Sequence, residues 1–198
     1  FKGDETKVFN DEAQMVNCIT QFVSNKFFDV FDIPIIEGEI PQREGYSDYR
    51  VVLNRAAMKA FGYQSLDEAF IRWESTQWSY SVNGKMVKGG KELMPVAAVV
   101  EDYYSGHLTQ GIKPMVFVLI GEQDMGTANI CLRPGQEEAC IDYLKKITQE
   151  VYNTDEFSYT WLKDDVLDIY KKDRQITIIY FVFAFIAIAI SCLGLFGI

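Results

Sequence analysis

Short hydrophobic runs divide most of this chain into predicted strands. Apolar runs bounded by turn residues are typical of strands buried on both faces of a sheet, and they occupy residues 50–54, 93–101, 114–120 and 128–132. Residues 156–161 alternate between polar and apolar positions and predict a further strand. The Asn83-Gly84 pair, which joins residues 71–82 to residues 85–88, is the strongest hairpin signal in the sequence.

Capping residues predict where helices begin and end. Asn54 is expected to cap a helix over residues 55–61, which Gly62 ends in a left-handed conformation. An earlier helix is expected over residues 24–31, and a short one is expected after Ser65, which begins a capping box.

One longer helix is predicted over residues 135–153. Its apolar residues recur at spacings of four, three and four residues, at Cys140, Leu144, Ile147 and Val151. We expect this stripe to face the core, with charged residues largely outside it. Strands and helices mix along the chain without strict alternation, which favours an α+β fold over a doubly wound parallel one.

The last 23 residues, 176–198, contain no Asp, Glu, Lys, Arg or His. As a helix this segment would be about 35 Å long, enough to cross a bilayer core of about 30 Å. We therefore predict a transmembrane helix, preceded by a stalk helix over residues 163–175 that Asp164 or Asp165 caps. Because no Gly or Pro interrupts the sequence before Gly194, the stalk and the span are expected to form one rod.

Charge excludes one class of partner. The net charge of −9 lies entirely ahead of the span, and nucleic-acid binding requires clustered Lys and Arg. The nearest basic cluster is Lys171, Lys172 and Arg174, which is interleaved with Asp168 and Asp173. We interpret this cluster as the water-side boundary of the span, and charge alone leaves the orientation in the membrane open.

Cysteine usage does not predict a disulfide framework. Cys18, Cys131 and Cys140 precede the span, which is an odd count, and Cys192 lies within it. A bond between Cys131 and Cys140 stays open as an alternative, but we expect free, partly buried thiols.

No residue pattern predicts catalysis, a cofactor or a metal site. Ser105 lies near His107, the only histidine, but no GxSxG motif surrounds it. Residues 84–91 approach a phosphate-binding loop but lack its Lys and its Ser or Thr at the required positions. One histidine and widely spaced cysteines do not supply a zinc site of ordinary spacing. We therefore expect a protein that is not an enzyme.

Four phrases, in order, carry a resemblance to a known family. They are VSNKFFDVFDIPIIEGE, VVLNRAAMKAFG, PVAAVVEDYYSGHLTQGIKPMVF, and WLKD followed by Tyr170, Asp173-Arg174 and the terminal LGLFG. Together they resemble the extracytoplasmic domain of ABC transporter permeases of the MacB/FtsX type, from about Phe22 to the end of the chain. The sequence departs from the family pattern at Ala98, where Gly is usual, and at residues 65–70, which lack a Pro-Ile-Gly-Lys phrase.

The resemblance implies a permease subunit of the bacterial inner membrane, with four spans and a periplasmic domain between the first and second. Residues 1–162 would be this periplasmic core domain, with mixed βα units and an inserted β-rich lobe at about residues 40–105. Residues 163–175 would be the stalk and residues 176–198 the second span, so that residues 1–175 are extracytoplasmic. The resemblance also implies a homodimer, a separate cytoplasmic ABC ATPase domain or subunit and, in many relatives, a periplasmic adaptor.

The expected function is mechanical transmission. Movement driven by ATP hydrolysis in the cytoplasm would pass along the rod to the periplasmic domain, for export or mechanotransmission. We expect the coupling residues of the stalk to be Tyr170, Lys171, Arg174 and Gln175. The alternative is a ligand-sensing ectodomain of a membrane receptor that signals through the same helix, and an enzyme anchored by its tail ranks third.

Flanking sequence distinguishes these hypotheses. Because the chain begins at Phe1 without Met, we expect a fragment or a processed product, with another span just before it. Two further spans after Ile198 would favour the permease, whereas a cytoplasmic coiled coil and a kinase would favour the receptor. The hydropathy of the native gene on both sides of these residues is the measurement that checks this expectation.

Overall fold

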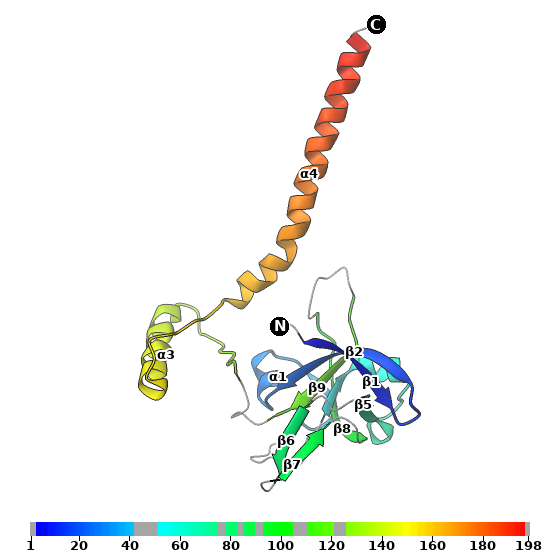
Figure 1. Ribbon diagram of the computed structural model, residues 1–198, viewed down its shortest axis with the longest axis vertical. Helices are drawn as coiled ribbons and strands as arrows, with labels where there is room; N and C mark the ends of the chain where they lie inside the picture. The colour runs from blue at the N-terminus through cyan, green and yellow to red at the C-terminus, as the bar shows by residue number, and fades with distance from the viewer. Residues whose placement is uncertain are drawn as a thin grey trace. The chain divides into compact units, whose positions relative to one another are not determined.

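The structure is a computed structural model, and it describes residues 3–41, 51–74, 78–82, 85–89, 93–104, 111–120 and 126–196. The chain forms two compact units, Phe1–Cys131 and Leu132–Ile198. Strands belong to the first unit, and the two longest helices belong to the second (Figure 1).

One mixed sheet of seven strands forms the first unit, in the order β3-β8-β4-β9-β2-β1-β5. Its strands are β1 (Asp4–Asn10), β2 (Met15–Val23), β3 (Ile35–Gly38), β4 (Val51–Asn54), β5 (Phe70–Trp73), β8 (Met94–Val100) and β9 (Met115–Leu119). The β4–β8 and β2–β9 pairs are parallel, and the other pairs are antiparallel. Because β5 pairs with β8 as well as with β1, the sheet closes on itself and leaves β3 as an appended strand.

The central strands are apolar at nearly every position because both faces of the sheet are covered. Along β4, Val51 and Leu53 belong to one core cluster and Val52 belongs to the other, and all three side chains are fully buried. Strand β9 alternates in the same way between the two clusters. The prediction that residues 93–101 and 114–120 form buried strands is therefore confirmed.

Two short helices complete these two cores. Helix α2 (Arg55–Phe61) contributes Ala57, Met58 and Phe61 to the first cluster. Helix α1 (Phe27–Val30), shorter than the predicted 24–31, contributes Phe27 and Phe28 to the second. The rings of Phe28 and Phe117 meet edge to face, with centroids 5.2 Å apart, which is a favoured geometry for buried aromatic pairs.

Asn54 ends β4 and caps α2, as predicted, and it does more than a local cap requires. Its Oδ1 accepts hydrogen bonds from the backbone N–H of Ala57 at 2.9 Å and of Met115 at 2.8 Å. Its Nδ2 donates to the carbonyl oxygen of Lys113 at 3.0 Å. The predicted stop is also confirmed, because Gly62 takes a left-handed conformation with φ of 81°.

The predicted hairpin is confirmed as a separate two-stranded sheet of β6 (Trp78–Val82) and β7 (Lys85–Gly89), in which Val82 pairs with Lys85. The inserted lobe at about residues 40–105 is not confirmed, because β4, β5 and β8 of this segment pair into the main sheet. The short helix after Ser65 is a 3-10 helix, η1 (Leu66–Glu68), and the Ser65 side chain does not cap it, so the predicted capping box is not formed.

Two predicted strands are wrong. Residues 128–132 and 156–161 contain no strand, because apolar or alternating sequence favours an extended chain but does not supply a pairing partner. In the second segment the alternate aromatic residues contact each other instead, with ring centroids 5.9 Å apart for Phe157 and Tyr159 and 5.8 Å apart for Tyr159 and Trp161.

The second unit consists of α3 (Glu137–Tyr152) and α4 (Leu162–Phe196) with extended segments around them. The helix predicted over residues 135–153 is confirmed, but its stripe does not face a core in this unit. Cys140 is partly buried and Val151 is 67% exposed, and no residue of α3 is fully buried.

All four cysteines are free, as expected. Cys18 is buried, Cys140 is partly buried and Cys131 is exposed, so the expected partial burial is wrong for Cys131. Burial raises the pKa of the Cys18 thiol from its ordinary 9.0 to about 12. Burial also raises the pKa of Tyr103, whose hydroxyl donates to Oε1 of Gln21 at 3.0 Å.

We expect replacement of Asn54 by Ala to lower the free energy of unfolding by about 2–4 kcal/mol, because it leaves two backbone donors and one carbonyl without their buried partner. Chemical denaturation of the full chain in detergent micelles, followed by tryptophan fluorescence, measures this change. Asn17, which is exposed on β2, is the matched control, and Asn17→Ala should change stability by less than about 0.5 kcal/mol. Equal effects of the two substitutions would contradict the role assigned to Asn54.

The burial of the Cys18 thiol makes the free energy of unfolding depend on pH in alkaline solution. The pKa of Cys18 is higher in the folded chain than in the unfolded chain, so the unfolded chain releases the thiol proton first as pH rises. The contribution of the protonated thiol to the free energy of unfolding is therefore fully present below pH 9 and is lost as pH rises from 9 towards 12. The free energy of unfolding should therefore fall by on the order of 1 kcal/mol per pH unit in this window. Denaturation curves between pH 8 and 10.5 should show a shallower slope for Cys18→Ala and an unchanged slope for Cys131→Ala.

Candidate functional site in the C-terminal helix

Helix α4 is a single uninterrupted helix of 35 residues, about 52 Å long at 1.5 Å per residue (Figure 1). The prediction that the stalk and the apolar segment form one continuous helix is thus confirmed, and Figure 1 shows that this helix changes direction over its first turns. The predicted start at Asp164 or Asp165 is wrong, because the helix begins at Leu162. The carbonyl of Trp161 already accepts from the N–H of Asp164 at 2.9 Å, so both aspartates lie in the first turn, where negative charge is favoured.

The four residues predicted to couple the stalk, Tyr170, Lys171, Arg174 and Gln175, all belong to α4. At 100° per residue they fall within about 140° of the helix circumference, so they lie on one side of the rod. Tyr170 is partly buried and Gln175 is exposed. No observation tests a coupling role for these four residues, so their role stays a prediction.

Beyond this point α4 is long and apolar enough to cross a membrane. The segment Gln175–Gly194 has 20 residues and a mean hydropathy of 2.7, and none of it is buried within the protein. Its largest side chains are open to their surroundings, as the exposed fractions of Phe181 (72%) and Phe185 (74%) show. A continuous apolar surface of this size is typical of a lipid-facing or protein-facing segment and not of a surface in water. The segment is not folded back into the core.

The described residues were compared with the candidate sites that the sequence suggests. Among them no group of three or more His, Cys, Asp or Glu side chains could hold a metal ion. Ser105 and His107 lie outside the described residues. Residues 85–89, which the sequence analysis compared with a phosphate loop, form strand β7.

Sequence analysis missed one polar junction, which joins two of the phrases that carry the family resemblance. The carboxylate of Asp102 accepts from the backbone N–H of Ala56 at 2.9 Å, so a residue after β8 caps α2 from outside the helix. Beside it, Arg55 forms an ion pair with Glu101 at 2.9 Å. The residues in each of these contacts are 46 positions apart in the sequence, and no local sequence signal reports a contact over that distance.

A second ion pair ties the same region to β1. Lys113 Nζ lies 2.8 Å from Oε1 of Glu5, and this contact holds the pKa of the Glu5 carboxyl below its ordinary value. Both side chains are largely in solvent, so the pair adds little to stability. The junction therefore positions strands and α2, and it does not form a reactive site.

No protein-family model matches this chain, and no curated protein does. Solved structures do. One is a domain assigned to a permease protein from Porphyromonas gingivalis, with a TM-score of 0.51, 13% sequence identity, and coverage of 75% of this chain and 65% of that chain. Another is the periplasmic region of MacB from Actinobacillus actinomycetemcomitans, with a TM-score of 0.40, 13% identity, and coverage of 78% of this chain and 66% of that chain.

This chain spans slightly less than two thirds of each of these structures. At 13% identity the likeness to the permease domain concerns the fold alone. It shows that this chain shares the fold of a domain assigned to a permease, which agrees with the resemblance that the four sequence phrases carry.

Proposed function

We propose that this chain is part of a permease subunit of an ABC transporter of the MacB/FtsX type. Residues 1–162 would form its non-catalytic extracytoplasmic domain, residues 163–175 the stalk and residues 176–198 a transmembrane helix, in a bacterial inner membrane. The fold likeness to a permease domain and the apolar segment Gln175–Gly194 support this class of protein. No observation favours the alternative of a ligand-sensing receptor domain.

The observation that carries the coupling role is the continuity of α4. A helix passes a tilt at one end to the other only if nothing along it absorbs the bend, and sharp bends occur at Pro, Gly or an interrupted hydrogen-bond ladder. Between Leu162 and the first glycine at Gly194 the helix has neither Pro nor Gly. The stretch ahead of Gln175 is about 20 Å long, so a small rotation of the span would move the start of the helix by several ångström.

The proposed partners are those that the resemblance to permeases of the MacB/FtsX type implies. A separate cytoplasmic ATPase domain or subunit would hydrolyse ATP, and this sequence itself holds no complete phosphate-binding loop. In a homodimer, the movement would change the distance between the two extracytoplasmic domains. A periplasmic adaptor is a further proposed partner, and the net charge of −9 speaks against nucleic acid.

A proline placed in the middle of the stalk should uncouple ATP hydrolysis from extracytoplasmic movement. Tyr170→Pro or Ile169→Pro removes a helical hydrogen bond and kinks the rod, whereas the sheet of the first unit should stay folded. The measurement uses the complete complex with its ATPase in lipid nanodiscs. Spin labels on Cys131 of two copies, with the other cysteines replaced, report the distance change that ATP produces.

We expect the ATP-dependent distance change to be lost in the proline variants while ATP hydrolysis continues. Leu162→Pro is the matched control, because the first helical position tolerates proline, and it should keep the distance change. Tyr170→Ala separates the side chain from helix continuity. An unchanged movement in Tyr170→Pro would refute transmission through this helix.

A further inference from the structure

Strand β3 is the free edge of an otherwise closed sheet. It pairs with β8 on one side, and among the described strands no other strand pairs with it. All four of its residues are exposed, and the two isoleucines are notable because Ile35 is 45% and Ile36 43% accessible. An exposed apolar edge of this kind is a template to which another extended chain can add.

The backbone at the end of β3 is fixed in place by Gly38. This residue has φ of 78°, and a Cβ atom there would lie 2.3 Å from the carbonyl oxygen of Ala97 on β8. Only glycine fits such a close approach. The following Glu39 donates its N–H to the same carbonyl at 3.4 Å, so the edge and the residues after it hold a defined path.

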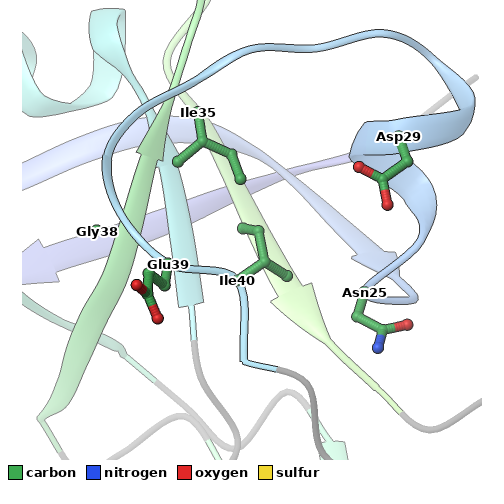
Figure 2. Close-up of a pocket in the computed structure, with 6 residues that line it drawn as sticks. All are labelled: Asn25, Asp29, Ile35, Gly38, Glu39 and Ile40. Carbon is green, nitrogen blue, oxygen red and sulfur yellow. The ribbon is translucent and has the colours of Figure 1, made fainter.

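A pocket of about 400 Å³ adjoins this edge. Asn25 and Asp29 from the α1 region line it together with Ile35, Gly38, Glu39 and Ile40. In Figure 2 the side chains of Ile35 and Ile40 lie between Glu39 on one side and Asp29 on the other. The pocket thus has a largely polar lining in which two isoleucine side chains lie between two carboxylates.

The carboxylates of this pocket are available to a ligand. Within the described part of the chain, neither Asp29 nor Glu39 makes a side-chain hydrogen bond or ion pair, and both residues are exposed. Glu37 on β3 adds a third negative charge, although its Oε1 also accepts from the N–H of Leu66 at 3.4 Å. A long aliphatic side chain with a cationic tip, that of Lys or Arg, matches two carboxylates with isoleucine side chains between them.

The same charges disfavour a second copy of this chain as the occupant. If two β3 edges paired with each other, Glu37 and Glu39 of one copy would approach those of the other, and like charges on adjacent strands are destabilising. Charge complementarity therefore favours a partner of opposite sign.

We infer that the free edge of β3 and its acidic pocket form a docking site for an extended, basic segment of a partner protein. The segment adds to β3 as a further strand, and one of its Lys or Arg side chains enters the pocket between Asp29 and Glu39. This inference concerns the first unit alone and does not depend on the proposed transport function.

A pair of synthetic peptides tests the inference on the full chain in detergent micelles. Both are ten residues long and labelled with fluorescein; Lys alternates with Val in one, and Glu alternates with Val in the other. Fluorescence anisotropy at low ionic strength should show that the basic peptide binds at least tenfold more tightly than the acidic one. Methylation of alternate backbone nitrogens of the basic peptide, on the edge that would face β3, should abolish binding because it removes the ladder donors.

Substitutions locate the site. The double variant Asp29→Asn, Glu39→Gln should weaken binding of the basic peptide about fivefold, as expected for two partly exposed ion pairs. The control double variant Glu12→Gln, Glu138→Gln removes the same number of exposed carboxylates elsewhere and should leave binding unchanged. Equal binding of the two peptides, equal loss in the two double variants, or indifference to methylation would each overturn the proposal. Stronger self-association of the Asp29→Asn, Glu39→Gln variant in sedimentation would assign the edge to a second copy and would overturn it as well.

Discussion

The first unit depends on the buried side chain of Asn54 more than on any other polar contact. One amide satisfies the first turn of α2 through Ala57 and also binds the chain ahead of β9 through Lys113 and Met115. A fully buried amide costs free energy unless its donors and acceptors are paired. Here they are paired with the backbone of Ala57 and with that of Lys113 and Met115, which lie 59 and 61 residues from Asn54 in sequence. The position of β4 between β8 and β9 and the entry of α2 into the core therefore depend on this one residue.

Local chemistry explains how much of the fold could be predicted from the sequence. Asn54 and Gly62 bound a helix through contacts within a few residues. The Asn83-Gly84 pair stands in the sequence between the paired strands β6 and β7, so these elements were predictable. The other half of the Asn54 network and the closure of the sheet by β5 and β8 depend on residues far apart in the chain. The hydrophobic pattern of a strand predicts which of its faces is buried, but it does not predict which other strand pairs with it.

The failed strand predictions and the candidate site show the same limit. Residues 128–132 and 156–161 have strand-like composition, yet a strand exists only where a partner edge accepts its backbone, and the described chain provides none to them. The span in α4 was predictable because composition over about 20 residues decides it without any partner. The edge at β3 was not predictable as a site, because it depends on which strands pair with β8, and these are far from β3 in the sequence or separated from it by other elements.

The two units are stiff for different physical reasons, and this difference bears on the proposed transmission. A sheet that closes on itself resists shear because sliding one strand would break ladder hydrogen bonds to both of its neighbours. The backbone hydrogen bonds of helix α4 are formed within the helix itself, so it can keep its helical conformation in lipid without a packed neighbour. In the proposed transmission, most bending would then occur in the segments without regular structure, such as residues 126–136 and 153–161. The length and composition of those segments, and not the sheet or the helix, would then set how much of an ATP-driven tilt arrives outside the membrane.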